Sequence, residues 1–192
     1  MEQSDGYVIA TAVTEEPLTV SEIKTRLRIT GTDQDDYIAA LITAARKQAE
    51  TITWGAFCTQ TWDVYFDKFE NDLQIWKGPI SSITSIKYQD ESNVEQTLAT
   101  ASYSKQRSTK SPFRIKILTA PSTYADGLEN VVVRFVAGYG AASTVPEIIK
   151  QAITVRVGTW YEVRQEIHTG TQVNVIDNWF ENMLHGEGHT GL

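Results

Sequence analysis

The apolar positions of this chain change their spacing twice. Between residues 33 and 54 they recur at steps of three and four, at Ile38, Leu41, Ile42, Ala45, Ala49 and Ile52. This spacing predicts a long helix with one buried face. A shorter apolar stripe predicts a helix near 19–28, and a third helical pattern, with a broad apolar face, predicts a helix over 146–165.

Side chains that start helices stand at two of these boundaries. Thr19 and Glu22 have the spacing of a capping box, in which a hydroxyl and a carboxylate satisfy free amides of the first turn. Thr144 and Glu147 have the same spacing. Pro146 falls in the first turn of that helix, where its missing N–H has no cost. Both boxes are therefore predicted to open a helix.

The long helix has signals at both ends. Thr32 or Asp33 is expected to cap it, and Asp35 and Asp36 place negative charge where the helix dipole favours it. Gly55 suits the position just after the last turn. The helix is therefore predicted to span residues 33–54.

From residue 59 the apolar spacing becomes two. Within residues 59–69, Trp62, Val64 and Phe66 share one face, which predicts a strand. Further strands are expected at 73–77, 83–89, 94–99, 113–118 and 130–138. Residues 89–93 are typical of a hairpin tip, and residues 105–112 of an exposed loop.

The predicted fold class is α+β. An antiparallel helical base, with helices near 19–28, 33–54 and 146–165, carries an inserted antiparallel β-rich subdomain at about 59–138 and a C-terminal tail. We expect a single domain over residues 1–192. Its parts are a loose arm over 1–17, a helical part over 18–56, the β-rich subdomain over 57–138, a helix over 139–168 and a tail over 169–192 with a short amphipathic segment.

Composition narrows the class of protein. The 192 residues are 41% hydrophobic and 21% charged, as in ordinary globular proteins. The net charge of −7 argues against a surface that grips nucleic acid, because phosphate binding needs Lys and Arg gathered on one face. Cys58 is the single cysteine, so no internal disulfide can form. No apolar stretch approaches the length of about 18 residues that spans a membrane.

The stretch FVAGYG, residues 135–140, raises the question of a nucleotide site. Glycines between a strand and a helix occur in phosphate loops, but those have the pattern GxGxxG or GxxxxGK[ST]. Here the third glycine and the lysine are missing. Gly138 and Gly140 are therefore interpreted as a sharp structural turn into the last helix.

Candidate chemical groups are few. His185 and His189 lie four apart around Glu187, but two intervening glycines remove the rigid helix that a metal pair needs. Cys58 has no evident His and acid partners and is interpreted as a small core residue. The acidic run at 33–36 lacks the EF-hand pattern. We therefore expect no catalytic, metal-binding or cofactor-binding residues, and no cofactor.

Aromatic side chains are the remaining signal. Five tryptophans are many for this length, and Trp and Tyr anchor subunit interfaces. The short C-terminal segment has few neighbours of its own to bury its aromatic pair, so it is predicted to pack on another chain. The candidate interface residues are Trp179, Phe180, Ile176, Leu184, Trp160 and Tyr161.

Several stretches occur together in an order that resembles the head–tail connector (adaptor) proteins of tailed bacteriophages. They are LTVSEIKTRLRI, DDYIAALITAARKQAE, TQTWDV, PISSITSIKYQD, VRFVAGYG followed by VPEIIKQAI, and VGTWYEVRQ. The resemblance covers about residues 17–184, and its strongest part is the helix with Trp160 and Tyr161 after the Gly-Tyr-Gly turn.

The resemblance implies a virion assembly protein without enzymatic activity. Copies would form a homo-oligomeric ring beneath the portal protein, with the portal's twelve-fold symmetry, and would dock the stopper or tail completion protein. The ring would lie at the head–tail interface of a virion assembled in the host cytoplasm, with no membrane partner. DNA would pass through the channel without specific binding, which suits an acidic chain.

Two alternatives remain open from the sequence. One is another virion part, such as a tail completion or terminator protein. The other is a small enzyme or ligand-binding α+β protein that uses the Gly-Tyr-Gly turn and Cys58.

Overall fold

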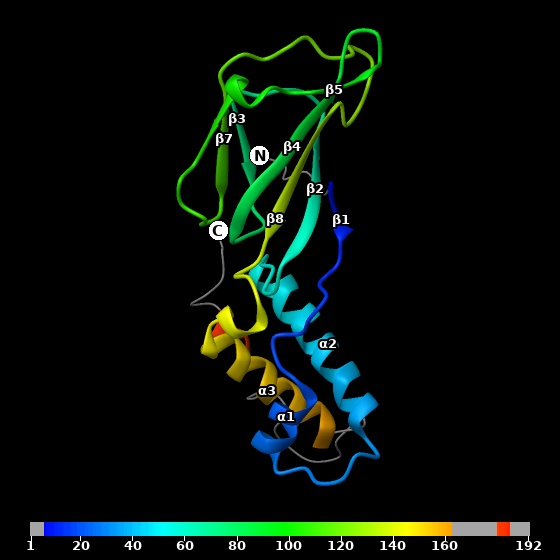
Figure 1. Ribbon diagram of the computed structural model, residues 1–192, viewed down its shortest axis with the longest axis vertical. Helices are drawn as coiled ribbons and strands as arrows, with labels where there is room; N and C mark the ends of the chain where they lie inside the picture. Colours follow the sequence, from blue (N-terminus) through cyan, green and yellow to red (C-terminus); the bar gives the residue numbers. More distant parts are fainter. Residues whose placement is uncertain (1–5, 163–179, 185–192) are drawn as a thin grey trace. The chain divides into compact units, whose positions relative to one another are not determined.

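The structure, a computed structural model, describes residues 6–162 and 180–184. Within this part the chain forms two compact units. The first, here called the β unit, contains the described residues up to 13 and residues 59–138. The second, the helical unit, contains residues 14–58 and the described residues from 139 onward. Figure 1 shows the helices and strands of both units.

The β unit contains two antiparallel sheets. The first has five strands in the order β1-β2-β8-β4-β5, and the second has three in the order β3-β7-β6. The strands of the first are β1 (Tyr7–Thr11), β2 (Gln60–Phe66), β8 (Val131–Ala137), β4 (Ile80–Gln89) and β5 (Glu95–Thr97). Those of the second are β3 (Asp72–Ile75), β7 (Phe113–Ile117) and β6 (Tyr103–Lys105).

Each sheet buries alternate side chains, as a period of two requires. In β8 the buried side chains include Val131, Val133 and Phe135. In β7, Phe113, Ile115 and Ile117 are buried and the residues between them are exposed. Each of the six strands predicted from the sequence overlaps a strand of the structure, although β4 begins three residues before its predicted start and β6 was not predicted. Residues 89–93 do form a hairpin tip, between β4 and β5.

The prediction of a loose arm over 1–17 is wrong for residues 7–11. Residues 7–11 form β1, which pairs with β2. The Tyr7 ring packs edge-on against Phe135 at 6.5 Å between centroids, and its hydroxyl accepts a hydrogen bond of 2.9 Å from the Trp76 N–H. Burial raises the pKa of Tyr7. These contacts are with residues far away in sequence, so the local pattern did not reveal the strand.

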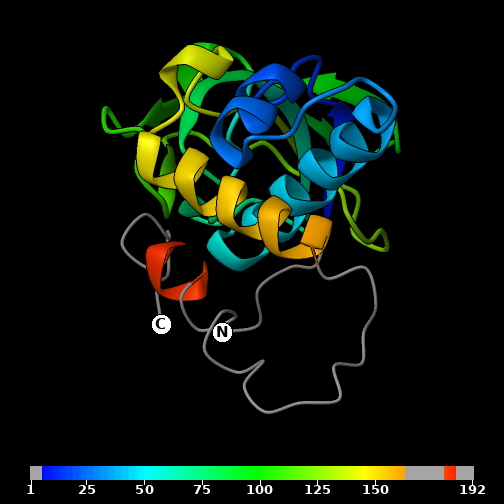
Figure 2. The ribbon, with the colours of Figure 1, turned by 90° about the horizontal axis from the view of Figure 1, so that it is seen from below.

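The helical unit consists of α1 (Val20–Leu27), α2 (Asp35–Thr53), α3 (Glu147–Glu162) and a short helical segment over residues 180–184. Figure 2 shows the three long helices together. The fully buried apolar side chains of the three are Ile23, Ile38, Ile42, Ala45, Ala49, Ile149, Ala152, Ile153 and Val157. The α+β class with a helical base and a β-rich insertion is therefore confirmed.

One of the two predicted capping boxes is present. The Thr19 N–H donates to Glu22 Oε2 at 2.7 Å, and the Glu22 N–H donates to Thr19 Oγ1 at 3.2 Å. The hydrogen bonds from Thr19 lower the pKa of Glu22. At Thr144 the prediction is wrong. Its hydroxyl donates to the carbonyls of Tyr139 and Ala141, which turns it away from the helix, and Glu147 accepts a hydrogen bond from Arg26 instead.

The predicted cap of α2 is also wrong. The residue before its first turn is Gln34, without a side-chain cap, and neither Thr32 nor Asp33 takes that role. Asp35 lies in the first turn as predicted, where it accepts a hydrogen bond of 2.7 Å from Lys24. This ion pair joins α1 to α2, whereas a local side-chain cap would bond only the end of α2.

The Gly-Tyr-Gly turn is structural. Gly138 and Gly140 have φ values of 124° and 121°, in the region that favours glycine. The Tyr139 N–H donates to the Phe57 carbonyl at 2.9 Å. A Cβ on Gly140 would lie 3.0 Å from Thr144 Oγ1. Both glycines are therefore required for the chain to enter α3.

The buried face of α2 generates a direct test. Ile42 is 1% exposed, whereas Ala44 on the same helix is exposed. Replacing Ile42 with Asp removes a large apolar group and buries a charge, and should cost more than about 3 kcal/mol of unfolding free energy. The matched Ala44→Asp variant should change it by less than about 1 kcal/mol. Equal losses of unfolding free energy in urea titrations would show that the buried face of α2 is assigned wrongly.

Candidate assembly surfaces

The described residues contain no constellation for catalysis or metal binding. No group of three or more His, Cys, Asp or Glu side chains among them could hold a metal ion. Cys58 is fully buried, as a core residue should be. Burial, with the nearby charges of Glu15 and Glu16, raises the pKa of its thiol to about 11. The thiol is therefore protonated at neutral pH and a poor nucleophile. His168, His185 and His189 lie outside the described residues.

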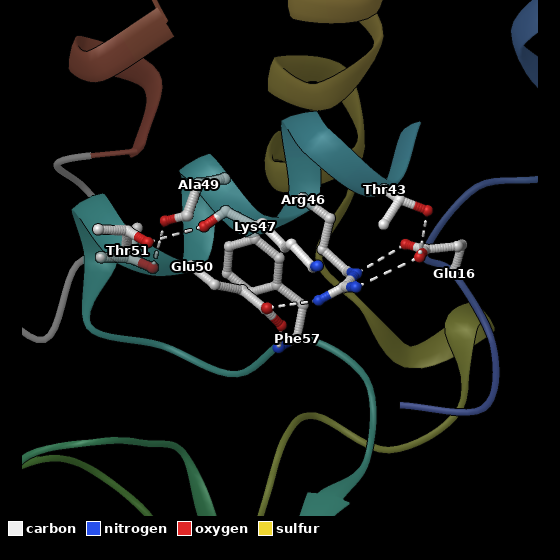
Figure 3. Close-up of polar contacts among 9 residues, drawn as sticks. Glu16, Thr43, Arg46, Lys47, Ala49, Glu50, Thr51 and Phe57 are labelled. Atoms are coloured by element: carbon white, nitrogen blue, oxygen red, sulfur yellow. Dashed lines mark hydrogen bonds and ion pairs between the residues drawn. The ribbon is translucent and has the colours of Figure 1, made fainter. Parts of the chain in front are cut away.

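The main polar feature of the helical unit is a buried charge cluster on α2 (Figure 3). Arg46 is 4% exposed and Glu50 8% exposed. Arg46 donates to Glu16 at 2.7 Å and to Glu50 at 2.6 Å. Glu50 accepts a further hydrogen bond of 2.9 Å from the Phe57 N–H. We call Glu16, Arg46 and Glu50 the arginine cluster.

The electrostatics of the arginine cluster favour its charged form. Burial alone would lower the pKa of Arg46, but the hydrogen bond to Glu16 and the charge of Glu50 outweigh it and raise the pKa. Thr43 donates a further hydrogen bond of 2.9 Å to Glu16. A buried charge is tolerated only when it is paired and hydrogen-bonded, as Arg46 is by Glu16 and Glu50. The cluster thus holds residue 16, α2 and residue 57 together.

A second polar anchor lies on α3. The Arg156 guanidinium lies 5.0 Å from the centroid of the Trp160 ring and 4.8 Å from that of the Phe180 ring. Its Nε also donates to Gln48 Oε1 of α2 at 2.7 Å. A cation between two aromatic faces attracts both rings. Arg156 therefore brings together two of the interface residues predicted from the sequence.

The short helical segment over 180–184 packs on its own chain. Phe180 is 1% exposed and Leu184 is fully buried. Figures 1 and 2 show the segment, in red, beside α3. The expectation that this chain could not bury Phe180 is therefore wrong, because Arg156 and the helical unit cover the ring. Ile176 and Trp179 lie outside the described residues.

The remaining two predicted interface residues lie at the end of α3. Trp160 and Tyr161 are half-buried. The Tyr161 ring lies 6.3 Å from the Tyr37 ring of α2, with a tilt of 36° between their planes. Tyr37 is 39% exposed. The ends of α2 and α3 thus present partly open aromatic side chains, and we call Tyr37, Trp160 and Tyr161 the aromatic surface.

An open groove of about 540 Å³ follows α1 and α3. Leu27, Val155 and Gly158 supply its apolar wall. Gly158 permits the close approach of α1, since a Cβ there would lie 3.1 Å from Leu27 Cδ2. Arg26 and Glu162 give the groove a polar rim.

The sequence reasoning missed Arg46, Glu50, Arg156 and Gln48. A local signal existed for three of them, because Arg46 and Glu50, like Arg156 and Trp160, are four residues apart on a helix and share a face. No local signal existed for Glu16 or Phe180, whose partners are distant in sequence.

None of the helices in the described part of the chain has the length and apolar character needed to cross a membrane.

These features define an α+β protein with partly open aromatic side chains and, among its described residues, no metal-binding cluster. Residues 17–120 match the model of the family described as "Phage gp6-like head-tail connector protein". The match covers more than half of the chain, so the chain belongs to this family of head–tail connectors. Such proteins are structural, and this decides against the small enzyme that the sequence left open. Comparison with curated protein sequences gave no match.

Solved structures show the same fold. One is a chain from the "Neck of empty GTA particle computed with C6 symmetry", with a TM-score of 0.75 and 22% identity over 92% of this chain and 94% of the other. A second, from the "Virion of native gene transfer agent (GTA) particle", has a TM-score of 0.74, 22% identity and the same coverage. A third, from the "Neck of native GTA particle computed with C12 symmetry", has a TM-score of 0.70 and 22% identity over 90% and 93% of the two chains.

The arginine cluster generates the second test. Arg46→Met leaves two carboxylates without their cation and should cost about 3–5 kcal/mol of unfolding free energy. Arg26→Met removes a cation from an exposed pair with Glu147 and should cost less than about 1 kcal/mol. Adding Glu16→Gln and Glu50→Gln to Arg46→Met should recover part of the loss. If urea titrations show that Arg46→Met lowers the unfolding free energy no more than Arg26→Met does, the arginine cluster does not stabilise this region.

Proposed function

We propose that this protein is a connector subunit in the neck of a phage-like particle. Copies form a closed ring beneath the portal, extend the DNA channel and dock the stopper or tail completion protein. The observation that carries this proposal is the family match over residues 17–120. The likeness of fold to chains from GTA necks, over nine-tenths of both chains, supports it.

A ring of identical subunits sets a physical requirement. Each subunit needs two different surfaces that complement each other, because head-to-tail contacts close the ring. The similar neck structures were computed with C6 and C12 symmetry. A twelve-fold ring, matched to the portal, is the symmetry we propose here.

The aromatic surface is the proposed docking site for the portal or a neighbouring subunit. Trp and Tyr supply large contact area at low entropic cost and are frequent anchors of interfaces. Trp160 and Tyr161 are half-buried, so the fold positions them and leaves part of each side chain exposed. Phe180 and Leu184 hold the C-terminal segment on the helical unit. We propose that Ile176 and Trp179, which precede that segment, extend the same interface.

The negative net charge of the chain is compatible with a channel through which DNA passes. A net charge of −7 repels phosphates on average, so DNA can pass the ring without being held by it. We propose that DNA passes the ring without specific binding and that the ring needs no cofactor.

Capture by heads tests this function. Purified chain should co-sediment with DNA-filled heads that contain the portal and lack a connector. Trp160→Ala with Tyr161→Ala should weaken capture by at least about tenfold, since interface anchors each contribute about 2 kcal/mol.

The matched control is Ile149→Ala, a buried position on the same helix. It should lower stability without changing capture at temperatures where every variant is folded. Capture of the double variant at the unsubstituted level would remove the aromatic surface from docking. Failure of the unsubstituted chain to bind portal-bearing heads would overturn the proposed function itself.

A further inference from the structure

One stretch of this acidic chain contains no acidic residue. From residue 96 to residue 125 there is no Asp or Glu, although the whole chain has 24. The same stretch contains five of the 17 basic residues, namely Lys105, Arg107, Lys110, Arg114 and Lys116. All five lie between the start of β6 and the end of β7. We call residues 103–117 the basic hairpin.

The strand pairing sets the directions of the side chains. β6 and β7 are antiparallel neighbours, with Ser104 opposite Lys116. Phe113, Ile115 and Ile117 are buried, so the alternate residues Arg114 and Lys116 lie on the outer face of the three-stranded sheet. The other three cations lie on β6 or in the loop that joins the two strands, and all are exposed.

The loop that carries two of these cations is held by hydrogen bonds. The Gln106 side chain donates to the carbonyls of Ser108 at 3.3 Å and of Lys110 at 3.0 Å. The Ile80 N–H donates to the Thr109 carbonyl at 3.0 Å. Arg107 and Lys110 are therefore presented from an ordered loop at the end of the hairpin.

Little negative charge offsets the hairpin. Arg114 donates to Asp72 at 2.6 Å, which neutralises one cation. Among the described residues, the other four cations of the hairpin have no carboxylate partner within 4.0 Å. Salt screens charges over about 10 Å, so a ligand at the hairpin responds to this local excess more than to the net charge of the chain.

We propose that the basic hairpin binds the phosphate backbone of double-stranded DNA without reading its sequence. Backbone contacts in proteins are made by Lys, Arg, Ser, Thr and Gln side chains, and residues 104–111 contain no other type. A protein partner would need an apolar anchor at the centre of the contact, which this loop does not offer. The net charge of the whole chain does not reveal this local concentration of cations.

The contact is weak and local. Four unpaired cations match the sequence-independent binding of a few phosphates, with a Kd on the order of 10⁻⁴ to 10⁻⁶ M at physiological salt. Such a contact lets DNA slide past the hairpin and does not hold it in place. The inference stands on the charges of the hairpin and does not depend on the ring proposed above.

The test is fluorescence anisotropy of a labelled duplex of about 30 base pairs, titrated with the full chain at several salt concentrations. Four phosphate contacts predict a slope of about −3.6 for log K against log salt, hence a loss of about 100-fold between about 50 and about 200 mM. The variant R107Q/K110Q/K116Q should bind at least about tenfold more weakly at low salt, with a slope near about −1.

The matched control is R28Q/K47Q/K68Q, which removes three exposed cations elsewhere and lowers the net charge equally. It should retain the slope and most of the affinity. Three results would overturn the proposal: no binding by the unsubstituted chain, equal losses in both variants, or a hairpin variant that alters self-association in sedimentation and leaves DNA binding unchanged. The last result would assign the hairpin to contacts between copies. None of these results bears on capture by heads.

Discussion

The helical unit depends on one buried guanidinium. Arg46 links residue 16, which precedes α1, to Glu50 near the end of α2. Glu50 in turn binds the N–H of Phe57, and the Phe57 carbonyl accepts from Tyr139 at the turn into α3. These hydrogen bonds link the segments at which the chain enters and leaves the helical unit. Because removal of a buried cation leaves its carboxylates unpaired, the stability of this region depends on Arg46.

The helices and most strands could be predicted because their patterns are local. The spacing of Ile38, Ile42 and Ala45 reports a helix face whatever lies opposite, and the alternation in β2 and β7 does the same for strands. The cap at Thr19 followed from residues three apart. The cap at Thr144 failed because its hydroxyl found carbonyl acceptors in the preceding turn. Local spacing does not reveal such competition.

What the sequence could not show was decided by distant partners. β1 exists because β2 and Phe135 are present beside it. Phe180 is buried because Arg156, on another element, lies against its ring. Of the candidate interface, the sequence indicated Trp160 and Tyr161, whose rings remain partly open. It did not reveal the roles of Tyr37 or Arg156, since aromatic and cationic side chains on a helix have many possible partners.

We propose that this protein acts by fitting its copies and neighbours in the neck of a particle. Electron cryomicroscopy of particles assembled with the chain tests this most directly. We expect a closed ring of copies directly beneath the portal, with α3 at a subunit or portal contact. Particles that are complete and filled without the protein, or density for it elsewhere than at the neck, would contradict the account.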